Sequence, residues 1–148
     1  ARAATGAGAA GGAGLALAAL GGTLTPGAEL LATEIGLAER VESAGLVLTG
    51  EPTYGWSSLR PPAPVAVVAG TAASCAVPCV VLAERVLAGR RETAVAGVDA
   101  TYDLAPAELL VSPAAGGAAG ATAGDVVAED LAGRLRAAAA RATRDWVR

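Results

Sequence analysis

The chain has 148 residues, which suits a single domain that buries roughly 70% of its unfolded surface. Its net charge of −3 and its pI near 4.9 exclude the basic surface that nucleic-acid binding needs, so we expect no nucleic-acid partner. The sequence contains neither His nor Lys, which excludes a histidine base, an imidazole metal ligand and a lysine that holds a phosphate.

A glycine-rich segment opens the chain. Gly6–Gly14 is followed by Leu15–Leu20, a run of helical propensity that a Gly-Gly pair ends. The uncharged stretch 3–28 is too rich in glycine for a membrane span and lacks the basic region of a signal peptide, so we expect no membrane partner. Because the sequence starts without Met inside this segment, we expect residues 1–25 to lie at the junction with a second domain, supplied by a missing N-terminal half.

Two short helices, a strand and a polar loop are predicted next. Pro26 suits the first turn of a helix, and Leu37–Ser43 has the pattern of another. The apolar run Leu46–Thr49 predicts a buried strand, and the polar segment Thr49–Arg60 follows it as a loop. Because ligands of open α/β sheets bind beyond the carboxyl ends of the strands, this loop is the default site.

Three prolines interrupt the segment after this loop. Pro61, Pro62 and Pro64 each remove a backbone donor and restrict the preceding residue, so a helix expected from near Ser57 to Ala73 should begin late or be distorted. The same prolines, with Gly and a further Pro, also exclude a membrane span from the uncharged stretch 61–83.

The remainder of the chain alternates strands and helices. We predict strands at Cys79–Ala83 and Val98–Tyr102, a helix at Arg90–Ala96, a mobile loop at Ser112–Gly124 and a terminal helix that begins at Gly124 or Asp125. Strands that alternate with helices at this spacing predict an α/β fold. We therefore expect residues 26–148 to form a Rossmann-like parallel sheet flanked by helices, with the three strands as neighbours.

Two small clusters have more than one interpretation. Cys75 and Cys79 cannot complete a zinc site without His or further Cys, and burial as small apolar side chains is favoured over a disulfide. The basic run Arg90–Glu92 is either a phosphate-binding patch or a solvated first helical turn with a local ion pair.

Several segments carry motifs in the order found in one family. They are Gly8–Gly14, Pro26 with its following glycine, Thr49–Glu51 with Ser58–Arg60, and Pro78–Ala83 followed by Gly89–Glu92. Together they resemble the loops of bacterial glycerate kinases, in particular the actinobacterial type. The resemblance covers the chain from Gly6 to about Tyr102, whereas the tail from Pro106 matches only as a generic terminal helix.

The resemblance implies that the chain is the C-terminal part of a two-domain cytoplasmic glycerate kinase. Such an enzyme transfers the γ-phosphoryl group of ATP, with Mg²⁺, to D-glycerate. By this resemblance Glu51 binds the metal or orients the glycerate hydroxyls, and Ser58 assists catalysis. The residues implied to hold substrate or phosphate are Thr49, Gly50, Arg60, Gly8, Gly11 and Gly12.

The signature loop, which is the segment that begins at Thr49, departs from the family pattern at several positions. Gly55 and Pro62 stand where the family has Asp and Lys, and Pro52, Ser57 and Pro61 replace Gly, Gln and Gly. Two alternatives therefore stay open. One is an inactive relic or paralogue of the family, with a non-enzymatic role. The other is a generic nucleotide-binding module, suggested by the G-x-G-x-x-G match at 6–11, although no strand precedes that match.

Overall fold

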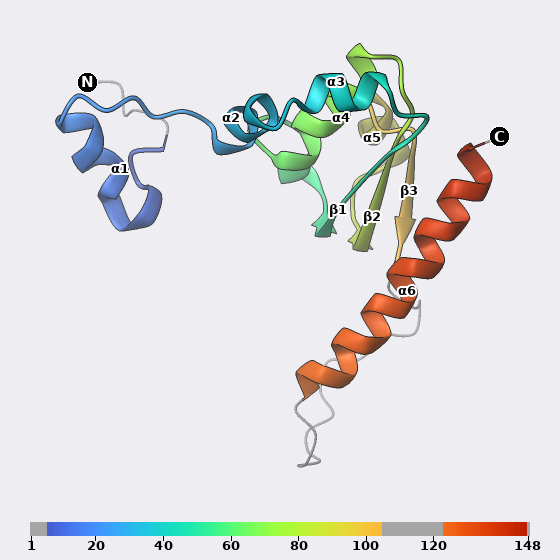
Figure 1. Cartoon of the computed structure of the whole chain (residues 1–148). Helices are drawn as coiled ribbons and strands as arrows, with labels where there is room; N and C mark the ends of the chain where they lie inside the picture. The colour runs from blue at the N-terminus through green and yellow to red at the C-terminus, as the bar shows by residue number, and fades with distance from the viewer. Residues whose placement is uncertain (1–5, 105–122, 148) are drawn as a thin grey trace.

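The computed structural model describes residues 6–104 and 123–147 (Figure 1). The predicted loop at 112–124 lies outside these residues as far as residue 122. In chain order the elements are α1 (Ala9–Ala19), α2 (Gly27–Glu34), α3 (Leu37–Glu42), β1 (Val47–Tyr54), the 3₁₀ turn η1 (Trp56–Ser58), α4 (Pro64–Ser74), β2 (Cys79–Val86), α5 (Arg90–Val95), β3 (Ala100–Asp103) and α6 (Ala123–Trp146).

The described strands form one parallel sheet in the order β1-β2-β3. Val47 lies opposite Cys79, and Val80 lies opposite Ala100. The predicted α/β fold with neighbouring parallel strands is therefore confirmed. β2 is the central strand, and its first five residues are all buried, which is why they form a continuous apolar run.

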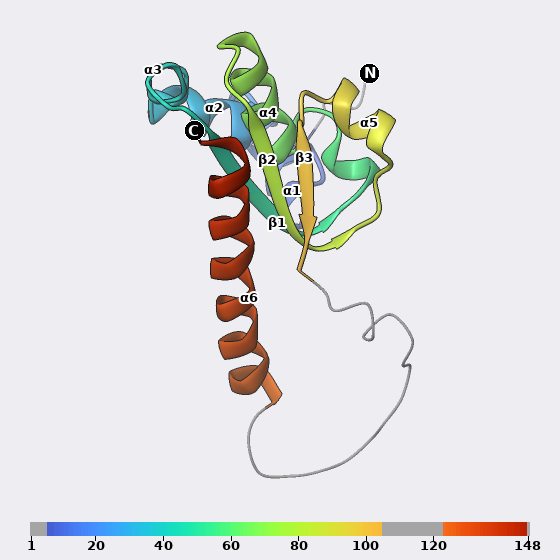
Figure 2. The ribbon, with the colours of Figure 1, turned by 90° about the vertical axis from the view of Figure 1, so that its right-hand side faces the viewer.

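Helices cover both faces of the sheet, and β2 contributes alternate residues to the two cores. On one face Val81 and Ala83 pack with Ala69 of α4. On the other face Val80 and Leu82 pack with Ala138 of α6. Figure 2 shows α6 as a long helix whose C-terminal part lies beside the sheet and whose N-terminal part extends past the ends of the strands. Alanines at these contacts let the helices approach closely, but each buries little area.

The prolines delay α4 as predicted. The chain forms the 3₁₀ turn η1 after β1, and α4 begins only at Pro64, which occupies the first turn of the helix. A proline is tolerated there because the first backbone N–H groups of a helix have no intrahelical partner. The predicted helix over 57–73 is thus shortened at its N-terminal end.

The N-terminal helix α1 stands apart from the sheet and its flanking helices in Figure 1. It contains a break at Ala10–Gly12, where φ is 50°, 67° and 98° in turn. Its leucines Leu15, Leu17 and Leu20 are exposed. Among the described residues, no helix is both long enough and apolar enough to cross a membrane.

Both cysteines carry free thiols. Cys79 is buried at the start of β2, where its backbone N–H donates to the Asp99 carboxylate at 2.8 Å, and Cys75 is partly exposed. Burial, and secondarily the negative charge of Asp99, raises the pKa of the Cys79 thiol from 9.0 to about 11. The interpretation as a small buried apolar side chain is confirmed for Cys79.

This thiol should make the fold sensitive to alkaline pH. Its pKa is raised in the folded state, so its contribution to stability is complete below pH 9.0 and is lost as the pH rises toward about 11. We expect the free energy of unfolding to fall by about 2–3 kcal/mol over this range. Urea unfolding of Cys79→Val should lack this loss, whereas Cys75→Val should retain it. Equal pH profiles for Cys79→Val and the unsubstituted chain would contradict the assignment.

Candidate functional site

The residues predicted to open the signature loop lie instead inside a strand. β1 continues from Val47 to Tyr54, so Thr49, Gly50 and Glu51 pair with β2 rather than forming a loop. The prediction that the strand ends at Thr49 is wrong. A strand at the edge of the sheet tolerates proline, and the register between β1 and β2 omits Pro52.

Gly50 has a packing reason to be glycine. A β-carbon at this position would lie 2.5 Å from the backbone oxygen of Leu82 on β2. That oxygen belongs to the central strand and cannot move freely. The close approach of β1 and β2 at this point therefore accounts for Gly50 without a ligand.

A pair of glycine substitutions tests this packing. Gly50→Ala should lower the free energy of unfolding by about 1–3 kcal/mol, because the added methyl group overpacks the strand contact. Gly70→Ala is the matched control, since Gly70 lies in α4 with nothing within 4 Å of an added β-carbon. Alanine there should be stabilising by up to about 1 kcal/mol. Urea melts of both variants measure the difference, and a neutral Gly50→Ala would refute the close contact.

Glu51 and Tyr54 hold two buried polar atoms that have no hydrogen-bond partner. They are Glu51 Oε1 and the Tyr54 hydroxyl. Burial raises the pKa of Tyr54 to about 12, with smaller contributions from the negative charges of Cys79 and Glu51. The electrostatic influence of Glu51 on the tyrosine indicates that the two side chains are near each other. An unpartnered buried carboxylate oxygen is costly unless it meets a ligand, a water or a cation.

A cavity of about 400 Å³ lies between β1, β2 and α6. Thr49, Gly50 and Glu51 contribute to its wall, together with Glu84 of β2. The rest of the lining is mostly leucine: Leu48, Leu82, Leu104, Leu131 and Leu135. Glu84 was not selected from the sequence, although it directly follows the buried run of β2. Glu51 pairs with Ala83, whose side chain packs with α4, so the register places the Glu51 side chain on the opposite face of the sheet and leaves Glu84 as the carboxylate on the cavity side.

Ser58 and Arg60 lie on either side of the end of η1 and differ in exposure. Ser58 is buried, and its hydroxyl accepts the backbone N–H of Gly55 at 3.1 Å, so it fixes the turn after β1. Arg60 is exposed and borders a separate hollow with Trp56 and Arg91. Ser58 therefore has a structural contact, whereas Arg60 is available to an anion.

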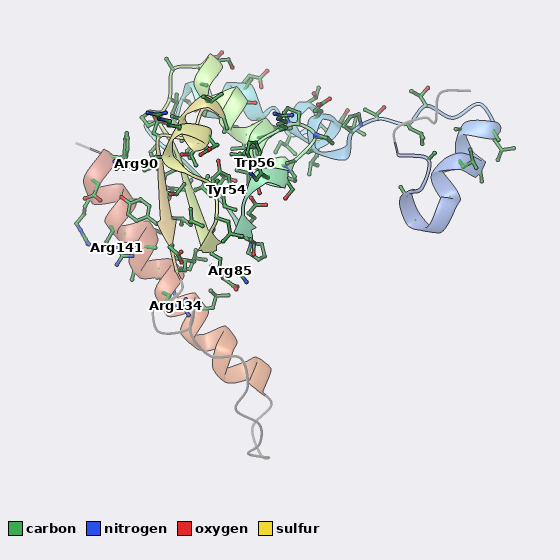
Figure 3. All side chains as sticks on the ribbon, turned by 180° about the vertical axis from the view of Figure 1, so that it is seen from behind. Tyr54, Trp56, Arg85, Arg90, Arg134 and Arg141 are labelled. Carbon is green, nitrogen blue, oxygen red and sulfur yellow. The ribbon has the colours of Figure 1, made fainter. Side chains whose placement is uncertain are left out.

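The glycines near the N-terminus are not brought to this site. Gly8, Gly11 and Gly12 belong to α1 or its immediate start, which lies apart from the strands in Figures 1 and 3. Gly11 and Gly12 need glycine for their positive φ, and nothing lies within 4 Å of a β-carbon added at any of the three. In this arrangement they do not share a cavity with Glu51 or Ser58.

The donor set for a metal is small. Within residues 6–104 and 123–147, no group of at least three His, Cys, Asp or Glu side chains could hold an ion. Mg²⁺ commonly uses only one or two carboxylates and takes its other ligands from phosphates and water. The unpartnered Oε1 of Glu51 is a carboxylate oxygen of the kind that Mg²⁺ binds, and it could contribute one of those protein ligands.

Comparisons with known proteins point in one direction. A family model described as the glycerate kinase family matches residues 1–134. The chain is also similar to a crystal structure from Salmonella typhimurium LT2, described provisionally as glycerate kinase 2, with 25% sequence identity and a TM-score of 0.55. That likeness covers 95% of this chain but only 34% of the other, so the chain spans about a third of its length. No curated protein matches.

Proposed function

The chain belongs to the glycerate kinase family, and we propose that the protein carrying it transfers the γ-phosphoryl group of ATP to D-glycerate in the cytoplasm. The observation that carries this proposal is the family match over residues 1–134. The parallel α/β sheet and the likeness to part of a solved structure support it. Since that likeness covers 34% of the solved chain, we propose that the remaining length of the protein completes the catalytic cleft.

Glu51 is the residue to which we assign the central role. Its unpartnered Oε1 would bind Mg²⁺ or accept a hydrogen bond from a glycerate hydroxyl. Bound Mg²⁺ supplies charge neutralisation for the transferred phosphoryl group. Thr49 is half-buried, lies two residues before Glu51 on the same side of β1, and is proposed to donate its hydroxyl to a phosphate or carboxylate oxygen.

The roles proposed for the loop and the glycines follow from their positions. Ser58 holds the turn through Gly55 and thereby positions Arg60, whose guanidinium would pair with an anion. Gly50 brings β1 close to β2 beneath the site. A phosphate-binding role for Gly8, Gly11 and Gly12 requires α1 to approach the strands from its separate position.

A second candidate function is a non-catalytic member of the family. The observation that favours it is the identity of residues 55 and 62, where Gly55 and Pro62 replace an acidic and a basic residue of the family pattern. Phosphoryl transfer depends on positioned charged groups, so both replacements remove groups of the type that the reaction needs. Such a non-catalytic protein would keep the fold of the family and bind partners without catalysing phosphoryl transfer.

An assay of the protein at its natural length separates the two candidates. ADP release is measured with ATP, Mg²⁺ and D-glycerate, with lactate as a control that lacks the terminal hydroxyl. The kinase proposal expects turnover that depends on glycerate. It also expects that Glu51→Gln lowers kcat more than Glu84→Gln, which neutralises a carboxylate of the adjacent strand by the same substitution. Absence of glycerate-dependent turnover would favour the non-catalytic candidate.

A further inference from the structure

Two buried polar atoms lie on the α4 side of the sheet without a hydrogen-bond partner among the described residues. They are Glu51 Oε1 and the Tyr54 hydroxyl. Glu51 pairs with Ala83, and both Ala83 and Tyr54 belong to the cluster that packs with α4, so the two side chains share one face of the sheet. The electrostatic influence of Glu51 on Tyr54 indicates that they are near each other. The hydroxyl is a donor and the carboxylate oxygen is an acceptor, so each could satisfy the other.

Tyr54 is the fixed member of this pair. It is the last residue of β1 and pairs with Val86 of β2 (Figure 3). Its backbone oxygen accepts the N–H groups of Leu87 at 2.8 Å and Ala88 at 3.2 Å. Its side chain is 0% exposed within the core. A hydroxyl on a ring that is locked by packing keeps its position while a neighbouring side chain adjusts.

Glu51 is the adjustable member. Within the described sheet β1 pairs only with β2, so Glu51 lies on an edge strand. The residue as a whole is half-buried although its Oε1 is buried, which places the carboxylate at the boundary between core and surface. Its partner across the ladder is the small Ala83, and the next residue is Pro52, which carries no backbone N–H. Neither of these neighbours offers the carboxylate a side-chain donor that would fix its direction.

The tyrosine hydroxyl needs an explanation that packing does not supply. Buried hydroxyl groups in folded proteins nearly always have a hydrogen-bond partner, and the exceptions often serve a function. A leucine at position 54 would fill much of the same core without burying an unsatisfied donor. The hydroxyl is therefore the part of Tyr54 that points to a role beyond the core, and the carboxylate of Glu51 is the acceptor nearby.

We propose that Tyr54 is a positioning residue for Glu51. Its hydroxyl donates a hydrogen bond to the Glu51 carboxylate when that carboxylate engages a ligand, and this bond fixes the direction of the carboxylate. Tyr54 does not contact the ligand itself, because it is fully buried. A hydrogen bond to an ionised acceptor is stronger than one between neutral groups, so it can hold a side chain on an edge strand. The identity of the ligand as D-glycerate with Mg²⁺ rests on the proposed function.

A single substitution, Tyr54→Phe in the protein at its natural length, removes only the hydroxyl. We expect the Kd for D-glycerate, measured by calorimetry with Mg²⁺ present, to rise roughly tenfold, as for the loss of one hydrogen bond to a charged group. We also expect kcat/KM for glycerate to fall by the same factor. Tyr102→Phe is the matched control, because the hydroxyl of Tyr102 donates to Asp145 on the α6 side of the sheet. Equal losses in the two variants would overturn the proposal.

Two further measurements separate positioning from a structural role. In a Glu51→Gln background, Tyr54→Phe should lose most of its effect on glycerate binding, because the charged acceptor is already gone. The same tenfold loss in that background would show that Tyr54 does not act through Glu51. Urea unfolding should show that Tyr54→Phe is at least as stable as the unsubstituted protein. Weaker binding that comes with a comparable loss of stability would make Tyr54 merely structural and would overturn the proposal.

The positioning role and the kinase function fail separately. Glycerate-dependent turnover with the same Kd and kcat/KM in Tyr54→Phe as in the unsubstituted protein would refute the positioning role and leave the kinase function standing. Glycerate binding that depends on both Tyr54 and Glu51, in a protein that never phosphorylates glycerate, would support the positioning role and refute the kinase function. Absence of any glycerate binding would overturn both.

Discussion

Restoring Asp at position 55 and Lys at position 62 should raise the glycerate-dependent rate of the natural-length protein by about 10²-fold or more. Removing one preorganised group that stabilises developing charge commonly costs roughly 10²–10³ in rate. Two groups that serve one reaction need not contribute additively, so the expected gain is a lower bound rather than a product. The measurement is kcat/KM for D-glycerate at saturating ATP and Mg²⁺.

The structure can accommodate both restored side chains. Gly55 has an extended backbone with φ −148°, and an added β-carbon would meet Leu87 Cβ at 3.7 Å, an ordinary contact. The hydrogen bond between Gly55 and Ser58 uses the backbone N–H of residue 55, so it survives the substitution. Pro62 is exposed, which leaves room for a longer side chain.

Uncharged analogues separate charge from shape in this experiment. Gly55→Asn with Pro62→Gln removes the same glycine and proline but restores no charge, so it should give little of the gain. If the unsubstituted protein turns over as fast as the charged pair, positions 55 and 62 do not carry the chemistry. The interpretation of a degenerate loop is then wrong.

The central part of the fold could be predicted because its sequence pattern has one simple cause. The continuous apolar run of β2 is buried by helices on both faces, and a helix can begin no earlier than Pro64, because a proline is tolerated in the first turn of a helix but not further inside it. The third strand was placed two residues early, at Val98–Tyr102 rather than Ala100–Asp103. Val98 is apolar because it packs into the core before the strand begins.

β1 shows where such reasoning fails. Gly50 and Pro52 are typical of loops, and local propensity alone ends the strand before them. Pairing with β2 keeps the chain extended to Tyr54. Pairing on both sides of Pro52 outweighs the local propensity of Gly50 and Pro52, so the contact with the neighbouring strand decides the length of β1.

The two aromatic residues near the end of β1 show which features of the site could not be predicted from the sequence. Only Gly55 separates Tyr54 from Trp56, yet Tyr54 is fully buried and Trp56 is mostly exposed. The turn that begins at Gly55 reverses their environments. No spacing rule in the sequence predicts that reversal, and neither the unpartnered tyrosine hydroxyl nor the exposure of Trp56 could be predicted without coordinates.

Tyr54 is also the position where the largest effect on stability is expected. It is 0% exposed and is the largest fully buried side chain in the described core, which otherwise consists mainly of Val, Ala and Cys. Tyr54→Ala should lower the free energy of unfolding by about 3–5 kcal/mol, because the lost ring leaves a cavity that small neighbours cannot fill. Urea unfolding followed by circular dichroism measures this loss. Tyr54→Leu, which keeps part of the volume, provides an intermediate variant if the alanine variant does not fold.

Tyr54→Phe should have the opposite sign. The ring is retained, and the hydroxyl that it removes is buried without a partner. An unsatisfied buried hydroxyl costs about 1–3 kcal/mol, so its removal should raise the free energy of unfolding by about 1 kcal/mol or more. A loss of stability in Tyr54→Phe would mean that the hydroxyl is bonded after all, through a water shared with Glu51 Oε1. In that case Glu51→Gln should reduce the stability advantage of Tyr over Phe at position 54, because the water that bonds the Tyr54 hydroxyl would lose its charged partner.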